Sequence, residues 1–372
     1  MLFTVQSDQI KIALTNILSV VDKKNTRPIL NNVCFNLCDN KIEISGTDTE
    51  IASRIIIPGK VEKQISFCVN AKNISDIVRS FPEGEIVFDI NEGTDSYLTI
   101  TKDKINFSLL TVSSEEFPKL FFGYENNLFN LKCKDIVNFI SITSYAISDD
   151  DTRPFLNGLF FQEVDSCLRI VATDAYTLSL YDLELPNVKI EQLTNGIIVP
   201  KKGVLELKNL AENYLEEELS FSVNDSFLFV KYKDEYFLSI RLIARDYPKY
   251  QAVIPGKISS TAIASTALLY DALRRIRLMA SEKTNAVKFA LSDGEVAITS
   301  DHPSMGKACE KFEIDYHGRD FEVTLNAKHL IEILHSLNDS EVIFELNNEL
   351  SPILIKSSNI PNYLGIIMPL NC

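Results

Sequence analysis

The densest group of side chains that could take part in catalysis is a run of three aspartates, Asp149 to Asp151. Carboxylates are preferred ligands of hard divalent cations, so this run raises the hypothesis of a metal-dependent nuclease or hydrolase. Consecutive side chains point in different directions, however, and no second acidic motif supplies further ligands. The histidines do not complete a site either, because His329 and His335 would lie nearly opposite one another on a helix.

Motifs of the common nucleotide-binding and hydrolase sites are also missing from the sequence. There is no G-x-S-x-G nucleophile, no P-loop and no dinucleotide-binding glycine pattern. We therefore expect a protein with no catalytic residue, no metal and no cofactor. An enzyme built on the aspartate run is kept as the alternative hypothesis.

Basic side chains recur at helical spacing in three parts of the chain and could bind phosphate groups. Lys72 and Arg79 are seven residues apart, which places them on one stripe of a helix. The other two groups are Lys201, Lys202 and Lys208, and Arg274, Arg275, Arg277 and Lys283. A net charge of −14 argues against a protein that coats nucleic acid, so any DNA contact must use these local basic faces. Ordinary solvated charge is the alternative interpretation of each group.

The elements that carry these groups belong to a sequence repeat of domain size. Residues 26–48 read TRPILNNVCFNLCDNKIEISGTD, and residues 152–174 read TRPFLNGLFFQEVDSCLRIVATD. The Thr-Arg-Pro-x-Leu-Asn motif and the closing Thr-Asp pair both recur after 126 residues. Asn70-Ala71-Lys72 recurs as Asn326-Ala327-Lys328. A period of this length is that of a domain and not of a solenoid. The predicted domains are residues 1–125, 126–255 and 256–372.

Each repeat combines two amphipathic helices with alternating apolar strands. Helical patterns lie within residues 10–21, 70–79, 133–146, 199–207, 266–282 and 325–334. Ser7 or Asp8 is the expected N-cap of the first helix. The fold class that follows is α+β, with two helices packed on antiparallel sheets in each of three repeated domains.

Location and cysteine chemistry follow from the same composition. No apolar run approaches the ~18 residues of a membrane span. The seven cysteines are odd in number and scattered, so we expect a cytoplasmic protein with reduced thiols and no membrane partner. Cys34 and Cys38 lie on one face of a predicted strand and are expected to be small core residues.

Repeated domains arranged head to tail can close into a ring when the rotation between them allows it. If two chains closed, their twelve helices, each ~10 Å across, would surround a hole of roughly 28 Å. Such a hole admits a DNA duplex, with basic residues inside that hold the phosphates loosely. An acidic exterior would discourage other DNA contacts.

The order of the motifs resembles the β sliding clamp family, the β subunit of bacterial DNA polymerase III. The resemblance covers essentially the whole chain, through FTV, RPILNN, GTD, NAK, PEG and FPKL, then TRPFLNG, VATD, VPKKGV, DYPKY and VIP, and finally IIMPL. It implies a sliding-clamp (DNA clamp) fold and a head-to-tail homodimeric ring around double-stranded DNA, independent of DNA sequence. An ATP-driven clamp loader places such a ring, which tethers the replicative polymerase as a non-catalytic processivity factor in DNA replication.

The resemblance also implies a pocket for short apolar peptides carried by polymerases, the clamp loader and repair proteins. The matching positions are Leu156, Thr173, Ala175, Tyr176, Thr177, Leu178, Pro248, Val253, Ile366, Ile367, Met368, Pro369 and Leu370. Apolar side chains and prolines from distant segments are typical of a rigid apolar groove, although plain core strands are the alternative. Better-known members have Gly-His-Arg where this chain has Ala175-Tyr176-Thr177, and a basic residue at Ala252. We therefore expect a pocket that has lost positive charge and gained an aromatic ring.

Two further sets of positions follow from the resemblance. For DNA contact they are Lys24, Lys72 and the loop Asp150–Phe155, with Asp150, Pro154 and Phe155. Lys24 and Lys72 replace arginines, which keeps the charge and loses the bidentate fork. Phe107, Leu278 and Met279 match the dimer contact between the first domain and the third domain of the neighbour. A peptide-binding scaffold that does not encircle DNA is the second alternative, and it would have no use for Lys24 and Lys72.

Overall fold

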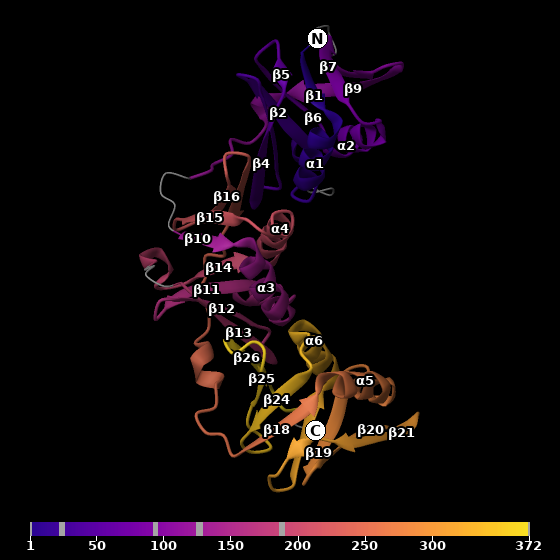
Figure 1. Cartoon of the computed structure of the whole chain (residues 1–372), viewed down its shortest axis with the longest axis vertical. Helices are drawn as coiled ribbons and strands as arrows, with labels where there is room; N and C mark the ends of the chain where they lie inside the picture. Colours follow the sequence, from indigo (N-terminus) through magenta and orange to yellow (C-terminus); the bar gives the residue numbers. More distant parts are fainter. Residues whose placement is uncertain (1, 22–26, 92–95, 124–128, 186–189, 371–372) are drawn as a thin grey trace. The chain divides into compact units, whose positions relative to one another are not determined.

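The computed structural model describes residues 2–21, 27–91, 96–123, 129–185 and 190–370 (Figure 1). The chain forms two compact units. The first consists of Met1–Ile136 and Lys202–Leu242, and the second of Val137–Lys201 and Ile243–Cys372. Both units draw on the middle repeat, so the exact bounds of the three domains stay a prediction from the sequence. In the described part of the chain, no helix is long and apolar enough to cross a membrane.

One antiparallel sheet of thirteen strands forms the frame of the first unit. In spatial order its strands are β10 (Phe129–Lys132), β15 (Glu218–Val223), β16 (Phe227–Tyr232), β17 (Tyr236–Arg241), β4 (Ile51–Pro58), β3 (Lys41–Thr47), β2 (Asn32–Cys38), β6 (Ile65–Asn70), β9 (Ile105–Ser113), β8 (Tyr97–Lys102), β7 (Glu85–Asn91), β1 (Phe3–Gln6) and β5 (Lys60–Val61). The pairing of β17 with β4, for example Leu238 opposite Ser53, joins the second repeat to the first. The sheet is therefore continuous across the repeats.

The helices α1 (Ser7–Leu18) and α2 (Ala71–Ser80) lie side by side in the first unit (Figure 1). The buried face of α1 is made by Ile10, Ala13, Leu14 and Ile17, which follow the helical period. The expected cap of α1 is wrong: the N-cap is Gln6, without a side-chain hydrogen bond. The Ser7 hydroxyl instead accepts a hydrogen bond from the amide of Gly84, at 3.1 Å.

The second unit contains a nine-stranded and a four-stranded sheet. The first comprises, in order, β14 (Ile197–Pro200), β11 (Gly158–Val164), β12 (Cys167–Thr173), β13 (Thr177–Glu184), β26 (Tyr363–Ile367), β25 (Ile353–Ser357), β24 (Glu341–Leu346), β18 (Ser260–Ser265) and β22 (Asp315–Tyr316). The second comprises β21 (Gly306–Glu313), β20 (Glu295–His302), β19 (Ala286–Ser292) and β23 (Phe321–Asn326). Here β13 pairs with β26 and so joins the second repeat to the third.

Four more helices complete the described fold: α3 (Cys133–Thr143), α4 (Lys201–Glu212), α5 (Thr266–Ile276) and α6 (Ala327–Leu337). The side chain of Asn326 caps α6, because it accepts hydrogen bonds from the amides of Lys328 and His329. Asn70 caps α2 in the same way, through the amide of Asn73. The recurring Asn-Ala-Lys motif is thus a helix start in both repeats.

The recurring Thr-Asp pair also forms the same hydrogen-bonded turn in both copies. Thr47 Oγ1 donates to the carbonyl of Ile51, and Thr173 Oγ1 donates to the carbonyl of Thr177. The following aspartates, Asp48 and Asp174, each accept two backbone amides of the turn. The pair therefore closes a tight turn after β3 and after β12.

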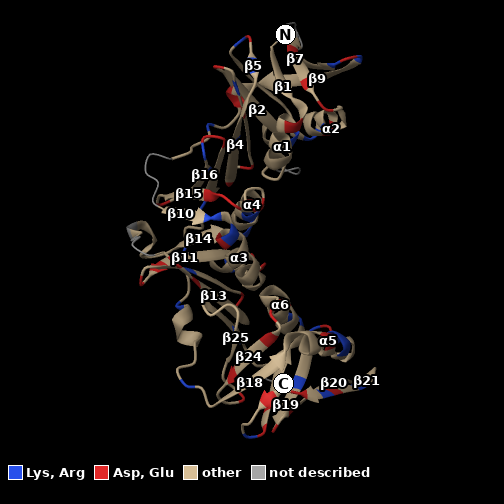
Figure 2. Cartoon of the chain, in the orientation of Figure 1, with Lys and Arg blue, Asp and Glu red and all other residues tan. Residues whose placement is uncertain are grey.

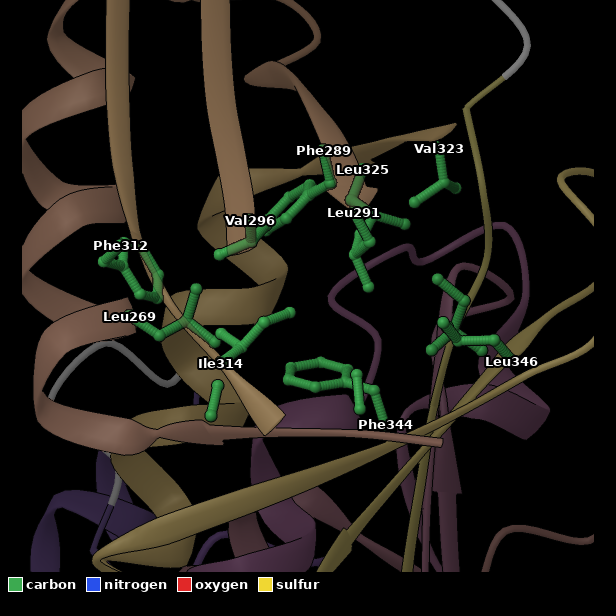
Figure 3. Close-up of a pocket in the computed structure, with 13 residues that line it drawn as sticks. Leu269, Phe289, Leu291, Val296, Phe312, Ile314, Val323, Leu325, Phe344 and Leu346 are labelled. Atoms are coloured by element: carbon green, nitrogen blue, oxygen red, sulfur yellow. The ribbon is translucent and has the colours of Figure 1, made fainter. Parts of the chain in front are cut away.

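The core of the second unit contains an apolar cavity of about 40 Å³ (Figure 3). Its walls come from α5 and from strands of both sheets, and include Leu269, Phe289, Phe312 and Phe344. All lining side chains are apolar, so a water molecule would find no hydrogen-bond partner there.

Cys34 and Cys38 are not the core residues that the strand pattern suggested. Cys38 is exposed and Cys34 is half-buried. The strand β2 directs Phe35 and Leu37 into the core, with 0% and 1% exposure, and the two cysteines have the opposite parity.

Candidate functional site

A largely apolar pocket of about 310 Å³ lies in the second unit. Four segments distant in sequence form it: the turn at Pro154–Leu156, the Thr-Asp turn after β12, the turn at Tyr250–Val253 and the end of β26. Its lining residues are Arg153, Phe155, Leu156, Thr173, Ala175, Tyr176, Thr177, Leu178, Pro248, Lys249, Tyr250, Val253, Ile366 and Met368. The structure thus brings together all the predicted pocket positions except Ile367, Pro369 and Leu370.

The Thr-Asp turn builds one wall of this pocket. Asp174 Oδ1 accepts hydrogen bonds from the amides of Tyr176 and Thr177, at 2.8 and 2.6 Å. These bonds fix a turn in which Ala175 has φ 78°, a left-handed conformation that glycine adopts more readily. Tyr176 follows directly and is 56% exposed. The local bonding therefore holds an aromatic ring at the pocket wall.

The floor of the pocket is part of the hydrophobic core. Leu156, Leu178, Ile366 and Tyr250 are all buried, with at most 4% exposure. The hydroxyl of Tyr250 donates to Gln162 Oε1 at 3.2 Å, which gives its buried oxygen a partner. A floor packed in this way is rigid, so the pocket exists before any ligand binds.

The end of β26 explains which C-terminal positions line the pocket. Ile366 and Met368 line it, and the Met368 amide donates to the carbonyl of Tyr176 at 2.9 Å. Ile367 is fully buried in the neighbouring core cluster, because side chains alternate along a strand. Ile367 therefore does not line this pocket. Pro369 and Leu370 also lie outside this pocket, and the Leu370 amide donates to the carbonyl of Thr324 at 2.8 Å.

Four lining residues were not predicted as pocket residues: Arg153, Phe155, Lys249 and Tyr250. Two of them, Arg153 and Lys249, are cations. The expected loss of positive charge therefore concerns the positions of Thr177 and Ala252, and the pocket as a whole still has two positively charged side chains. Arg153 Nε lies 2.8 Å from Asp150 Oδ2. Lys249 stands between Pro248 and Tyr250 in the DYPKY motif, and its proximity to Pro248 was a signal that could have identified it.

An aromatic contact extends the pocket wall toward α6. The rings of Tyr176 and His329 lie 6.0 Å apart between centroids, with an interplanar angle of 50°. His329 stands in the first turn of α6, which the side chain of Asn326 caps. The cap therefore fixes the position of the histidine beside Tyr176.

The loop from Asp149 to Phe155 does not form a metal site in the structure. Asp149 pairs with Lys201 and Asp150 with Arg153. Hydrogen bonds from Thr152, together with Arg153, lower the pKa of the Asp150 carboxyl to about 2. Among the described residues, no group of three His, Cys, Asp or Glu side chains is placed to hold a metal ion. Within this loop Phe155 lines the pocket, whereas Pro154 is exposed.

Basic residues gather on α4 and α5 (Figure 2), and most of them already have carboxylate partners. Lys201 Nζ lies 2.5 Å from Asp149 Oδ1, Lys202 pairs with Asp48, and Arg275 forms two hydrogen bonds with Glu310. Lys72 and Arg79 are both exposed on α2. Lys24 lies outside the described residues. The basic faces are thus partly neutralised within the chain.

Exposed apolar residues occur on strands and turns of each unit separately. In the first unit, Phe107 on β9 is 38% exposed and Leu110 is 60% exposed. In the second unit, Leu278 is 76% exposed in the turn Arg277–Met279, where Met279 is half-buried. β21 is a terminal strand of the four-stranded sheet. Exposed apolar groups beside an open strand edge are typical of interfaces.

Comparisons with known proteins cover nearly the full chain and indicate a single family. Residues 1–121, 130–249 and 251–371 match the models of the N-terminal, central and C-terminal domains of the DNA polymerase III beta subunit. The beta sliding clamps of Caulobacter vibrioides and Proteus mirabilis are each 27% identical, with 100% of both chains covered.

Solved structures give the same result for the fold. A Caulobacter crescentus beta sliding clamp with polyethylene glycol bound has a TM-score of 0.93 at 26% identity, and covers 100% of this chain and 98% of that one. A sliding clamp from Bartonella birtlesii bound to griselimycin also has a TM-score of 0.93 at 26% identity, with full coverage of both chains. The three-domain clamp architecture expected from the sequence is confirmed.

Proposed function

Because the chain belongs to the DNA polymerase III beta subunit family, the sliding clamps, we propose that two copies close head to tail around duplex DNA. The family consists of non-catalytic processivity factors, so the chain acts in DNA replication without a reaction of its own. An ATP-driven clamp loader places the ring on DNA. The replicative polymerase and other partners then bind to it.

The observation that carries the partner-binding part of this proposal is the preformed apolar pocket. Its floor is buried core and its rim carries Tyr176, Val253, Arg153 and Lys249. A short apolar peptide would bury its side chains on Leu178 and Ile366, while the cations remain at the surface for its polar groups. This combination of an apolar floor with few polar anchors suits a peptide better than a small polar metabolite.

For the ring itself, two apolar areas are the proposed contacts. One is on β9 around Phe107, and the other is the turn with Leu278 and Met279 near the edge strand β21. We propose that each area binds the other area of a second copy, since two different complementary surfaces give a closed head-to-tail ring when the rotation between the copies allows it.

For DNA, the basic helix faces supply loose contacts to phosphates without reading bases. Lys72 and Arg79 are exposed on α2, and Lys24 belongs to the same proposed set. The ion pairs of Lys201 and Lys202 reduce the positive charge available to DNA. Weak phosphate contacts are suited to a protein that must move along the duplex.

The pocket can be tested with a fluorescently labelled apolar peptide taken from the replicative polymerase of the same organism. Val253→Asp places a charge on a 39% exposed lining residue and is expected to weaken peptide binding at least tenfold. Ile258→Asp is the matched control, because Ile258 is 47% exposed and does not line the pocket. Equal affinities of both variants would contradict the assignment of the pocket.

A further inference from the structure

Two free thiols face each other across neighbouring strands in the first unit. Cys34 on β2 and Cys68 on β6 are direct partners in the antiparallel register. The adjacent pair, Phe35 and Phe67, stacks on the other face of the sheet with ring centroids 5.2 Å apart. Directly opposed residues share a face, so both sulfur atoms lie on the side away from these rings.

This register brings the two cysteines within the Cα separation that a disulfide can span. Directly opposed residues of antiparallel strands have Cα atoms about 4.5 or 5.5 Å apart, depending on the hydrogen-bond pattern. Disulfides span Cα distances of roughly 4.4–6.8 Å. Either kind of pair lies within this range of Cα distances, and closing the bond draws the two Cβ atoms together by up to about 1 Å.

The two thiols differ in exposure and in pKa, and therefore in reactivity. Cys68 is fully buried, whereas Cys34 is half-buried and open to a small oxidant. The hydrogen bond from the Cys68 thiol lowers the pKa of Cys34, and this effect exceeds those of burial and of the Glu43 charge, which raise it. The same interaction raises the pKa of Cys68, and burial raises it further. Cys34 is thus the better nucleophile of the pair.

The more exposed cysteine on the same strand is less suited to this reaction. Cys38 lies at the end of β2, where a hydrogen bond with Asp39 raises the pKa of its thiol. Cys38 stands opposite Lys41 in the register, so it has no cysteine partner there. Exposure alone therefore does not decide which cysteine is oxidised.

We propose that Cys34 and Cys68 form a dithiol that peroxide oxidises to an intramolecular disulfide. The Cys34 thiolate attacks one oxygen of hydrogen peroxide, the O–O bond breaks, and Cys34 sulfenic acid and hydroxide are formed. The Cys68 sulfur then displaces the sulfenic oxygen, which leaves as water with the Cys68 proton. The two thiols lose two electrons in total, and peroxide accepts them. This inference does not depend on the proposed DNA-binding function.

The disulfide would cross-link two central strands of the first unit. Because β6 runs directly into α2, the cross-link would also fix the start of the helix that carries Lys72. A cross-link restricts the unfolded chain, so oxidation is expected to raise the unfolding temperature of the full-length protein.

The test begins with reduced full-length protein that is freed of reductant and treated with a few equivalents of hydrogen peroxide. Remaining thiols are blocked with N-ethylmaleimide, and a tryptic digest is analysed by tandem mass spectrometry. Fragment ions are needed because Cys34 and Cys38 lie on the same tryptic peptide. We expect a Cys34–Cys68 linked peptide pair two hydrogen masses lighter than its parts, absent after dithiothreitol treatment. Absence of this pair, or preferential oxidation of another cysteine, would overturn the proposal.

Three variants separate the roles of the thiols. In Cys68→Ser, the Cys34 sulfenic acid cannot be resolved and should be trapped by dimedone at several times the wild-type level. Cys34→Ser should leave Cys68 unoxidised, whereas the control Cys38→Ser should still form the linked pair. Equal dimedone labelling of Cys34 in wild type and Cys68→Ser would contradict the resolving role of Cys68. If a variant fails to fold, the digest of the wild-type protein still tests whether the Cys34–Cys68 disulfide forms.

Discussion

Lys201 Nζ lies 2.5 Å from Asp149 Oδ1, in an ion pair that ties the first residue of α4 to the loop before the second Thr-Arg-Pro motif. The neighbouring residue Lys202 pairs with Asp48. Asp48 is also the aspartate that closes the first Thr-Asp turn. Under the proposed DNA contact, carboxylates of the chain would thus compete with DNA phosphates for these two lysines.

Asp149→Asn should free Lys201 for DNA. We expect several-fold tighter binding of a short duplex at low salt, with a plot of log K against log salt concentration steeper by about one. Fluorescence anisotropy across a salt series measures both quantities. Asp165→Asn is the matched control, since it makes the same charge change on an exposed turn of the second unit. A slope that changes equally in both variants would show only the effect of net charge.

The turn conformation of Ala175 leads to a second prediction. Its φ of 78° costs an L-residue roughly 1–2 kcal/mol, of which glycine recovers part after its own entropy loss. Ala175→Gly should therefore raise the free energy of unfolding by about 0.5–1 kcal/mol, measured by urea denaturation. Ala252→Gly, in the turn Tyr250–Val253 and without a positive φ, should not be stabilising. A stabilisation of both would point to a cause other than the backbone.

Much of the fold followed from the sequence because the repeated motifs are local structures. The Thr-Asp pair closes the same turn at Asp48 and Asp174, and Asn-Ala-Lys starts a helix at Asn70 and Asn326. Such bonds join residues within a few positions of one another, so a recurring pattern is sufficient to predict them.

Long-range pairing was less predictable. The sequence did not show that β17 pairs with β4 or that β13 pairs with β26, and these pairings decide which residues form each compact unit. Likewise, the sequence did not show that Arg153 lines the same pocket as Pro248, because only the fold brings their two segments together. The alternation along β26, by contrast, was available from the strand pattern and would have excluded Ile367.

The cavity in Figure 3 predicts a stabilising substitution. Ala264→Val adds two methyl groups on a strand that lines the void of about 40 Å³, and should raise the free energy of unfolding by about 1 kcal/mol. Ala297 on β20 does not line the void, so Ala297→Val should change the free energy of unfolding by less than about 0.5 kcal/mol. Thermal or urea unfolding distinguishes them. A destabilising Ala264→Val would mean that the space cannot accept the added volume.

Glu206 gives a prediction for pH dependence. The residue is 6% exposed on α4, and its burial raises the pKa of the carboxyl above 4.5 in spite of a hydrogen bond from Ser19. Because the pKa of Glu206 is higher in the folded than in the unfolded protein, the protonated carboxyl favours the folded state at low pH. This contribution to stability is lost as the pH rises through the folded-state pKa. The charges that face Glu206, those of Lys202 and Asp48, act in opposite directions.

Glu206→Gln should therefore stabilise the protein more at pH 7 than near pH 4, because the buried carboxyl loses its charge progressively as the pH falls. Unfolding midpoints in urea at both pH values measure the difference. Glu212→Gln, an exposed residue of the same helix, is the control and should show no such pH dependence. An equal effect of Glu206→Gln at both pH values would exclude burial of the charge as the cause.

Encirclement of DNA by two copies is tested most directly by a topological measurement. The protein is loaded onto nicked circular DNA with its clamp loader and ATP, and retention is followed by gel filtration before and after linearisation. A ring that encircles DNA remains on the circle and is lost from the linear form by sliding off its ends. Equal retention on circular and linear DNA would mean ordinary surface binding and would contradict the account.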